Sequence, residues 1–360
     1  MSARLRRLVG RGVQYYRSHG LLATIHKVAG FPGYGVWRRI YAAPAPAQRR
    51  AMRACGQRLS RQPVISVVMP VYQTPERFLR CAIQSVREQI YPNWQLCIVD
   101  DASPDAAIGR LLAEAAAADS RIRLGRLDRN GGIAAASNAA LAMAGGDYVA
   151  FLDHDDALAP DALLAVAMEI NAHPDAKLIY SDEDKLDPAG RHRDPYFKPD
   201  WNADLLLGQN YLNHLLVVRR SRLDEVGGFR LDFEGSQDHD LVLRLAEGIE
   251  PAHIRHIPRV LYHWRMVPTS FSTARLSSAT AAAGRAVAEH LARQGIVAEV
   301  EPDPATGRYL RVRRPLPEPP PRVTLVVPTH DKVCSVAPMH RRAAGWDRLS
   351  RPGDHRGRPR

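Results

Sequence analysis

From Pro63 onward the chain alternates short apolar runs with segments of helical periodicity, and this alternation restricts the fold more than any other feature. Residues 64–69 form a β-branched run bounded by prolines, which is typical of a buried strand. Thr74 and Pro75 are then predicted to be the N-cap and the first residue of a helix. Apolar side chains follow at helical spacing, at Phe78, Leu79, Ala82, Ile83 and Val86.

The same alternation continues as far as Tyr180. Strands are predicted at 96–101, 122–127 and 148–153, and helices at 104–118, at 133–144 and from Pro160. Crossover helices join parallel strands, so we expect an α/β fold with a doubly wound, mostly parallel sheet and flanking helices. Ligands of such sheets bind beyond the carboxyl ends of the strands. A loop-rich half follows up to about residue 265, and a helix predicted over 275–294 closes it.

The net charge of +12 is unevenly distributed along the chain. Residues 1–62 contain 13 Lys and Arg and no Asp or Glu, and residues 335–360 carry a net charge of +5, which leaves −6 for residues 63–334. An acidic body argues against nucleic acid as a partner. The basic N-terminal arm is compatible with contact to anionic lipid at the inner membrane, or with a solvated, partly helical extension.

Several protein classes are disfavoured by what the sequence lacks. It contains no apolar run long enough for a spanning helix, and its basic start is not followed by the apolar stretch of a secretion signal. The four cysteines have no metal-type spacing and fit a reducing compartment. We therefore expect a cytoplasmic protein, with peripheral membrane contact as the alternative.

Four segments are predicted. Residues 1–62 are a basic helical arm and linker, and residues 63–300 form the main domain. Residues 301–321 are a Pro-rich linker. Residues 322–360 begin with a run that repeats the first strand of the main domain and continue as an Arg-rich tail, for which disorder is predicted.

Two acidic clusters fall where ligands of a parallel sheet bind. Asp100 and Asp101 follow the second predicted strand, and residues 153–156, Asp-His-Asp-Asp, follow the fourth. Carboxylates brought together repel one another unless a cation or donor groups compensate. Mg²⁺ or Mn²⁺, sharing oxygens with a substrate phosphate, is the natural solution. The structural alternative is a pair of solvated acidic turns, or carboxylates favoured by a helix start.

Two common nucleotide-binding folds are not indicated. The turn after the first strand, residues 70–76, has neither the glycine pattern of a dinucleotide-binding fold nor that of a P-loop. The glycine pair of Asn130-Gly131-Gly132 is by itself a weak indication, because an ordinary turn explains it equally well.

Taken in order, these motifs resemble the inverting, GT-A-fold glycosyltransferases of family 2. The resemblance covers about residues 63–300. Two further motifs, Tyr180-Ser-Asp-Glu-Asp-Lys and Phe197-Lys-Pro-Asp-Trp, resemble a subgroup associated with bacterial surface polysaccharides. The resemblance to the family as a whole rests on seven runs: Val67-Val-Met-Pro-Val-Tyr, Ile98-Val-Asp-Asp-Ala-Ser, Asn130-Gly-Gly with Ser137-Asn, Asp153-His-Asp-Asp, Val226-Gly-Gly-Phe, Glu234-Gly-Ser-Gln-Asp-His-Asp-Leu and Leu261-Tyr-His-Trp-Arg.

The resemblance implies a nucleotide site. Pro70, Val71 and Tyr72 are expected to line the base and ribose. Asp101, with Asp100, is expected to accept a hydrogen bond from the imide of a uracil or thymine base, so UDP and dTDP sugars are the favoured donors. Asp153 is expected to approach the ribose or the metal shell.

It also implies the transfer chemistry. Asp155 and Asp156 are expected to hold Mg²⁺ or Mn²⁺ on the diphosphate. His263 is expected either to face the metal or the diphosphate or to be a buried structural histidine. Asp238 is expected to be the general base that activates a hydroxyl of a glycan or lipid-linked acceptor. The alternative is that Asp238 and Asp240 cap a helix predicted over 241–247, although only Asp240 is well placed to do so and Asp238 is expected in the preceding loop.

The sequence departs from the family pattern at two of these motifs. His154 fills a position that is more often small, and Gln237 precedes the expected base where many relatives have an acidic residue. The Gln-x-x-Arg-Trp signature of processive synthases is absent. We therefore expect transfer of one or a few sugars to each acceptor.

Two other functions and one hypothesis about the chain end remain open. A sugar-phosphate nucleotidyltransferase also combines an α/β sheet with acidic metal ligands, but it needs a glycine-rich basic loop after the first strand. A non-catalytic subunit that binds glycan or nucleotide sugar is the other alternative. The run beginning at Pro321 suggests a two-domain enzyme truncated at the start of its second transferase domain, with residues 335–360 not native.

Overall fold

The structure is a computed structural model that describes residues 33–41, 46–266, 276–307, 309–319, 321, 322 and 324. The chain divides into two units, residues 1–314 and 315–360. The principal strands of the first unit are β1 Ile65–Val71, β2 Trp94–Asp100, β3 Ile122–Arg126, β4 Tyr148–Phe151, β5 Ala157–Leu158, β6 Leu178–Leu186, β7 His192–Tyr196, β8 Leu216–Arg219 and β9 Ile254–Arg265. Its helices include α4 Glu76–Arg87, α5 Ala106–Ala118, α6 Ile133–Met143, α7 Ala162–Ala172, α8 Ala203–Gly208, α9 Arg220–Val226, α10 Gln237–Ala246 and α12 Leu276–Arg293.

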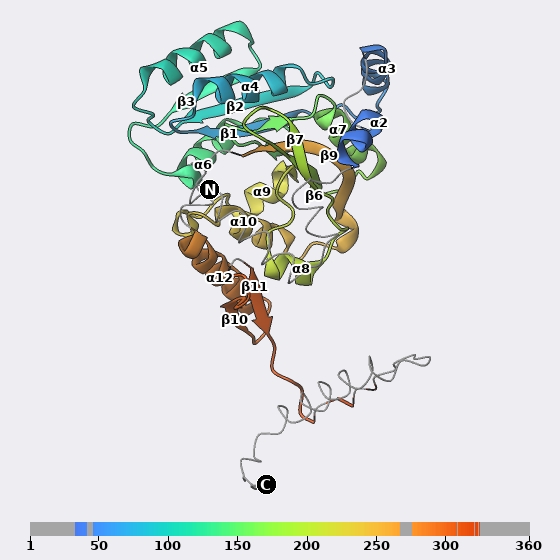
Figure 1. Ribbon diagram of the computed structural model, residues 1–360, viewed down its shortest axis with the longest axis vertical. Helices are drawn as coiled ribbons and strands as arrows, with labels where there is room; N and C mark the ends of the chain where they lie inside the picture. The colour runs from blue at the N-terminus through green and yellow to red at the C-terminus, as the bar shows by residue number, and fades with distance from the viewer. Residues whose placement is uncertain are drawn as a thin grey trace, which may run out of the picture. The chain divides into compact units, whose positions relative to one another are not determined.

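A nine-stranded sheet runs through this unit (Figure 1). Its strand order is β3-β2-β1-β4-β8-β6-β9-β5, with β7 paired to β6. Strands β3, β2, β1 and β4 are all parallel, as the alternating sequence predicts. Strand β8 is antiparallel to both β4 and β6, whereas β6 and β9 are parallel. The expected α/β fold with a doubly wound sheet and flanking helices is confirmed.

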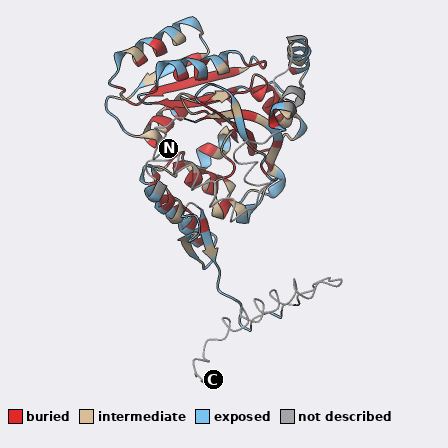
Figure 2. Cartoon of the chain, viewed as in Figure 1, coloured by how far each residue is buried: buried red, intermediate tan, exposed pale blue. Residues whose placement is uncertain are grey.

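Each face of the sheet is covered by helices. All residues of β1 and β2 are buried, which is typical of parallel strands packed on both sides (Figure 2). Successive side chains of a strand point to opposite faces, so Val67 belongs to the core formed with α4, α5 and α7. Val68 belongs to the core formed with α6, α10 and α12.

The start of α4 corrects one prediction. The helix begins at Glu76, one residue later than expected, and Pro75 is its N-cap. Thr74 makes no cap, because its hydroxyl lies 2.7 Å from Nδ1 of His154. The hydroxyl thus joins the turn after β1 to the acidic residues after β4.

Part of the predicted N-terminal arm forms helices that contact the main domain. These are α2, Tyr34–Tyr41, and α3, Pro46–Gln57. The Tyr34 hydroxyl donates to a carboxylate oxygen of Asp184 in β6 over 2.5 Å, and Met52 of α3 packs against the core. Residues 1–32 lie outside the described residues.

The prediction of a linker over residues 301–321 is wrong for the first part of that range. Strands β10, Glu299–Pro302, and β11, Leu310–Arg313, form an antiparallel hairpin. The side chain of Leu310 is buried in the same core as α12, which explains why these residues are ordered rather than a spacer. The predicted start of a second domain lies almost wholly outside the described residues.

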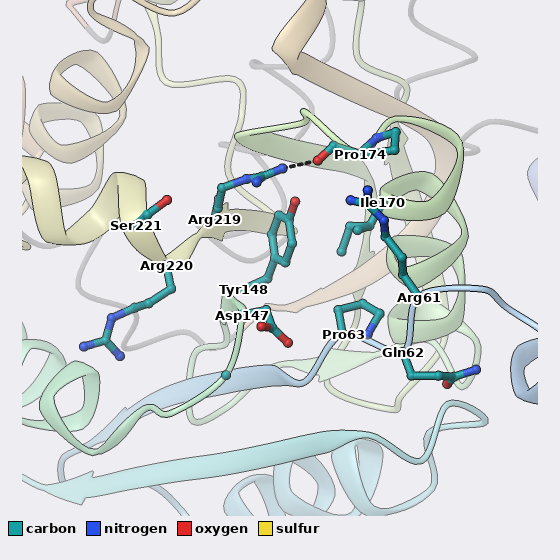
Figure 3. Close-up of a pocket in the computed structure, with 11 residues that line it drawn as sticks. Arg61, Gln62, Pro63, Asp147, Tyr148, Ile170, Pro174, Arg219, Arg220 and Ser221 are labelled. Carbon is teal, nitrogen blue, oxygen red and sulfur yellow. Dashed lines mark hydrogen bonds between the residues drawn. The ribbon is translucent and has the colours of Figure 1, made fainter.

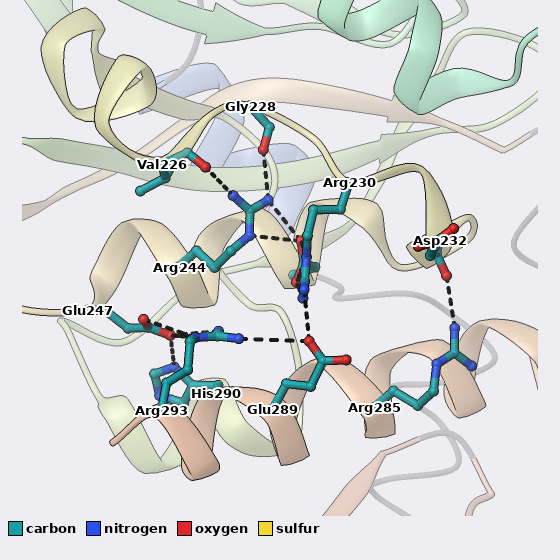
Figure 4. Close-up of polar contacts among 11 residues, drawn as sticks. Val226, Gly228, Arg230, Asp232, Arg244, Glu247, Arg285, Glu289, His290 and Arg293 are labelled. Carbon is teal, nitrogen blue, oxygen red and sulfur yellow. Dashed lines mark hydrogen bonds and ion pairs between the residues drawn. The ribbon is translucent and has the colours of Figure 1, made fainter. Parts of the chain in front are cut away.

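An ionic network joins α10 to α12 (Figure 4). Asp240 is fully buried and accepts hydrogen bonds from Arg230 and from Arg244, the latter pairing at 2.8 Å. Arg230 also pairs with Glu289 of α12 at 2.8 Å. The helix that was predicted to close the domain is therefore bound to the helix that carries Asp238.

Candidate functional site

The carboxyl ends of β1, β2 and β4 lie side by side, as the sequence predicts. The backbone N–H of Asp101 donates to the carbonyl of Val71 over 2.8 Å, which joins the ends of β1 and β2. Pro70 and Val71 are buried in the sheet, so of the three residues predicted to line the nucleotide, only Tyr72 has an exposed side chain.

Asp100 and Asp101 already have partners within the chain. Asp100 is ion-paired with Arg126 at 2.6 Å and accepts the backbone N–H of Ser103 at 3.0 Å. Asp101 accepts the N–H groups of Gly131 and Gly132, at 2.7 and 2.9 Å. The side chain of Asn130 donates to the same carboxylate.

These contacts explain the glycine pair that the sequence left ambiguous. Gly132 has a φ of +84°, and it is the N-cap of α6. Glycine adopts this backbone conformation without strain, which lets two successive N–H groups point at Asp101. The predicted contact of Asp101 with a base remains a prediction, and any base would share an acceptor with this turn.

The four residues Asp153–Asp156, called the acidic run below, follow β4 and differ sharply in exposure. Asp153 and Asp155 are partly exposed, whereas Asp156 is fully buried. One oxygen of Asp156 accepts the Tyr262 hydroxyl at 2.6 Å and the other accepts the N–H of Arg265 at 2.7 Å. Both oxygens of this predicted metal ligand therefore accept hydrogen bonds from β9. Of the two predicted metal ligands, Asp155 and Asp156, Asp155 is the more accessible carboxylate.

His263 lies in a different group from the one that the sequence predicts. Its Nδ1 is 2.6 Å from Asp184 Oδ1, and Nδ1 of His192 is 2.8 Å from the other oxygen. The ligand atoms of these three residues lie within 4.8 Å of one another and have the chemistry to hold a metal. Imidazole suits zinc and related ions better than Mg²⁺, so this group differs in preference from the acidic run.

Asp238 faces the acidic run from another element. It lies in the first turn of α10 and not in the preceding loop as expected, because the helix begins at Gln237 rather than at Leu241. A small pocket is lined by Asp153, Asp238, Asn213 and His214, with Phe151 and Phe229 in its walls. We call this the transfer pocket. It brings the expected donor side and the expected base to the same cavity.

Charge and burial set the protonation of these carboxylates. Burial raises the pKa of Asp238, while His214 and hydrogen bonds from Gln237 and Asn213 oppose the shift. Burial also raises the pKa of Asp153 to about 6, assisted by Asp238 and Asp155 and opposed by His214. A carboxylate whose pKa lies closer to neutrality is a better proton acceptor than an ordinary aspartate.

Three residues of the transfer pocket's surroundings were missed by sequence reasoning. Glu183 accepts the backbone N–H of His214 at 2.7 Å and lies 3.2 Å from its Nδ1. Lys198, whose side chain is fully buried, lies 3.6 Å from the same Glu183 oxygen and donates to the His214 carbonyl at 2.6 Å. Glu183 and Lys198 belong to the two subgroup motifs, so those motifs were the indication that could have located this network.

A larger hollow near the amino end of β4 does not compete for this role (Figure 3). It is lined by Arg61, Tyr148, Arg219 and Arg220 among others. The guanidinium groups of Arg219 and Arg220 donate to backbone carbonyls, so they are already used to hold the chain. Tyr148 begins β4, at the opposite end of the strand from Asp153.

Part of the chain matches a known family. Residues 66–227 match the model of Glycosyl transferase family 2. The chain is 46% identical over 280 residues to the uncharacterized protein y4gI of Sinorhizobium fredii. This alignment covers 76% of this chain and 30% of that protein. It is 45% identical over 293 residues to the O-antigen biosynthesis protein RfbC of Myxococcus xanthus, covering 81% of this chain and 23% of RfbC. The chain thus spans less than a third of each of these two relatives.

The fold has known counterparts as well. The crystal structure of S. aureus TarS 1-349 in complex with UDP-GlcNAc matches with a TM-score of 0.53 and 19% identity, covering 63% of this chain and 66% of that one. At this identity the likeness concerns the fold alone. In the described part of the chain, no helix is long and apolar enough to cross a membrane.

Proposed function

Since residues 66–227 match the model of Glycosyl transferase family 2, we propose that the chain moves a sugar from a nucleoside-diphosphate sugar to a glycan or lipid-linked acceptor in surface-polysaccharide assembly. The observation that carries this proposal is the transfer pocket, where Asp153 after β4 and Asp238 of α10 face the same cavity. The relationship to an O-antigen biosynthesis protein supports the choice of product class.

Asp238 is the proposed general base. An acceptor hydroxyl is a poor nucleophile at neutral pH, and a carboxylate within hydrogen-bonding reach takes its proton as it attacks. Attack on the anomeric carbon from the side opposite the diphosphate breaks the sugar–phosphate bond in one displacement and inverts the configuration. The leaving group is the nucleoside diphosphate, and the proton remains on Asp238.

Asp155 is the proposed protein ligand of Mg²⁺ or Mn²⁺. Such ions are commonly held by one or two carboxylates together with substrate phosphates and water. When bound, the ion neutralises the charge that grows on the departing diphosphate. Asp156, with both oxygens used by Tyr262 and Arg265, instead fixes the backbone of the acidic run.

The donor base is proposed to be uracil, with thymine as the alternative. The TarS structure that shares the fold was solved with UDP-GlcNAc. Tyr72 and Asp101 are the proposed contacts of the nucleotide, together with the backbone of Pro70 and Val71. No observation favours a nucleotidyltransferase or a non-catalytic subunit over transfer. The membrane contact proposed for the N-terminal arm rests on residues outside the described ones.

A donor screen tests the proposal. Binding of UDP-, dTDP- and GDP-sugars to the wild type is measured by calorimetry with Mn²⁺, Mg²⁺ or chelator, and slow donor hydrolysis is followed in parallel. Metal-dependent binding of a uridine nucleotide, lost in Asp155→Ala and kept in Asp238→Asn, is the expected result. The matched control is Asp232→Asn, an exposed carboxylate outside the transfer pocket. Failure of every donor to bind in the presence of metal would overturn the proposal.

A further inference from the structure

His214 is held from several directions, although it lies in a loop just before β8. Its backbone N–H donates to Glu183, its carbonyl accepts from Lys198, and its Nδ1 faces Glu183 at 3.2 Å. The ring stacks on that of Tyr262 with centroids 4.7 Å apart and an interplanar angle of 21°. These contacts use every polar atom of the residue except Nε2.

The remaining nitrogen points at the donor side of the pocket. Nε2 of His214 lies 3.6 Å from Oδ2 of Asp153. The sheet register explains the encounter, because β4 and β8 pair Tyr148 with Arg219 and Ala150 with Val217, and continuing this register brings His214 opposite Asp153. Both residues line the transfer pocket with Asp238.

We propose that His214 is a positioning residue of glycosyl transfer, which holds the Asp153 carboxylate toward the donor and is itself fixed by Glu183 and Lys198. The inference rests on the proposed function, because it concerns the same pocket. Nδ1 and Nε2 both face carboxylates, so a ring carrying a proton on each nitrogen satisfies both. Glu183 thereby fixes the orientation of the His214 ring, and the ring in turn orients the Asp153 carboxylate.

The alternative is that His214 only stabilises the fold. Its stacking on Tyr262 and its backbone hydrogen bonds would then explain it fully. The two cases differ in how His214 and Asp153 combine. Residues that act through one another give non-additive effects on binding, whereas a residue that only supports the fold acts independently of the donor contact.

A double-mutant cycle on donor binding tests the inference. Affinity for UDP with Mn²⁺ is measured for wild type, His214→Gln, Asp153→Asn and the double variant. We expect His214→Gln to weaken binding about tenfold, as for the loss of one close ion pair, and the double variant to bind no more weakly than the weaker-binding single variant. In steady-state kinetics the donor KM should rise more than kcat falls. Additive losses, or wild-type affinity in His214→Gln, would overturn the inference.

Two further variants keep the outcome interpretable. Glu183→Gln leaves His214 and Asp153 in place and removes only the charge behind the ring, so it should weaken UDP binding in the same direction. His290→Gln makes the same substitution on α12, where His290 pairs with Glu247, and should leave binding unchanged. Wild type that binds no nucleotide would refute the proposed function. Wild type and His214→Gln that bind equally would refute the positioning role alone.

A spectroscopic measurement reports on the network without any donor. Nitrogen-15 NMR of the histidine rings distinguishes a doubly protonated ring from either neutral tautomer. The His214 resonance, assigned by its loss in His214→Gln, should show both nitrogens protonated at pH 7.5 and should change in Glu183→Gln and in Asp153→Asn. A neutral ring that is indifferent to both substitutions contradicts the proposed link.

Discussion

The hydroxyl of Tyr262 donates to Oδ2 of Asp156 over 2.6 Å, and both side chains are fully buried. The two residues are 106 positions apart, one immediately before β5 and the other in β9. The ring of Tyr262 also supports His214, so one tyrosine contacts both the end of the acidic run and the wall of the transfer pocket. This contact makes the geometry of the site dependent on the last strand of the sheet.

Replacing Tyr262 by Phe should therefore reduce stability. The substitution keeps the ring but leaves one oxygen of buried Asp156 without its donor, which costs about 1–3 kcal/mol. Urea unfolding followed by circular dichroism measures the loss. Tyr72→Phe is the matched control, because Tyr72 is 40% exposed and its loss of a hydroxyl should change the free energy of unfolding little. Equal stability of the two variants would contradict the assignment.

Asp240→Asn should be among the most damaging substitutions in α10. It removes the charge that two arginines share at a fully buried position, and breaking a buried ion pair costs about 3–5 kcal/mol. Thermal and urea unfolding measure the effect. Glu289→Gln removes only the partly exposed arm of the same network and should cost about 1 kcal/mol or less. A loss of stability for Glu289→Gln as large as that for Asp240→Asn would contradict the central place of Asp240 in the network.

Asp238→Asn should abolish transfer while keeping the donor bound. Removal of a general base lowers the rate about 10²–10⁴-fold. Burial raises the pKa of Asp238, so the acidic limb of the wild-type kcat profile should lie above the ordinary aspartate range, with activity rising as the base loses its proton. Steady-state kinetics between pH 4 and 9 (a range chosen to span roughly the aspartate and histidine pKa values) test both points. A variant that retains transfer, or a limb at the ordinary aspartate pKa, would exclude this assignment.

The charge on His214 predicts a pH dependence of stability. Burial opposes the charge, but Glu183 first, with Asp153 and Asp156, outweighs it and raises the pKa of His214 to about 9. The charged His214 ring contributes its full stabilisation of the folded state below about pH 6.5, and this contribution is lost as the pH rises through about 9. The shift corresponds to about 3 kcal/mol.

Comparison of wild type with His214→Gln isolates this contribution. Asp238 and Tyr262 also face the ring, and Lys198, whose pKa burial lowers to about 8, titrates in the same range, but all three are present in both proteins. The difference in free energy of unfolding should be largest near pH 6 (roughly the lower end of the window) and should shrink toward pH 10 (roughly its upper end). A difference that does not change with pH would refute the charged state.

The sequence predicted the sheet and most of the residues around the site, because strand periodicity and acidic residues after strands are local features. The parallel strands β1, β2 and β4 end together, as expected. Long-range partners were the part that could not be predicted. Nothing near Asp156 in the sequence shows that Tyr262 and Arg265 use both of its oxygens.

His263 and Asp238 illustrate the same limit. A histidine in a strand points to one face or the other according to register, and the pairing of β9 with β6 brings the ring of His263 to Asp184. For Asp238, a difference of a few residues in the start of α10 changes a loop residue into a helical one. Both depend on contacts between segments far apart in the chain, which periodicity does not report.

The dependence of Asp156 on β9 has a consequence for how the protein can be divided. The segment that matches the family ends at residue 227, before Asp238 and before Tyr262. A fragment that stopped there would contain the whole acidic run, yet Asp156 would have neither the phenol nor the N–H group that donates a hydrogen bond to it. During synthesis the same holds for the nascent chain, whose acidic run stays incomplete until Arg265 has left the ribosome.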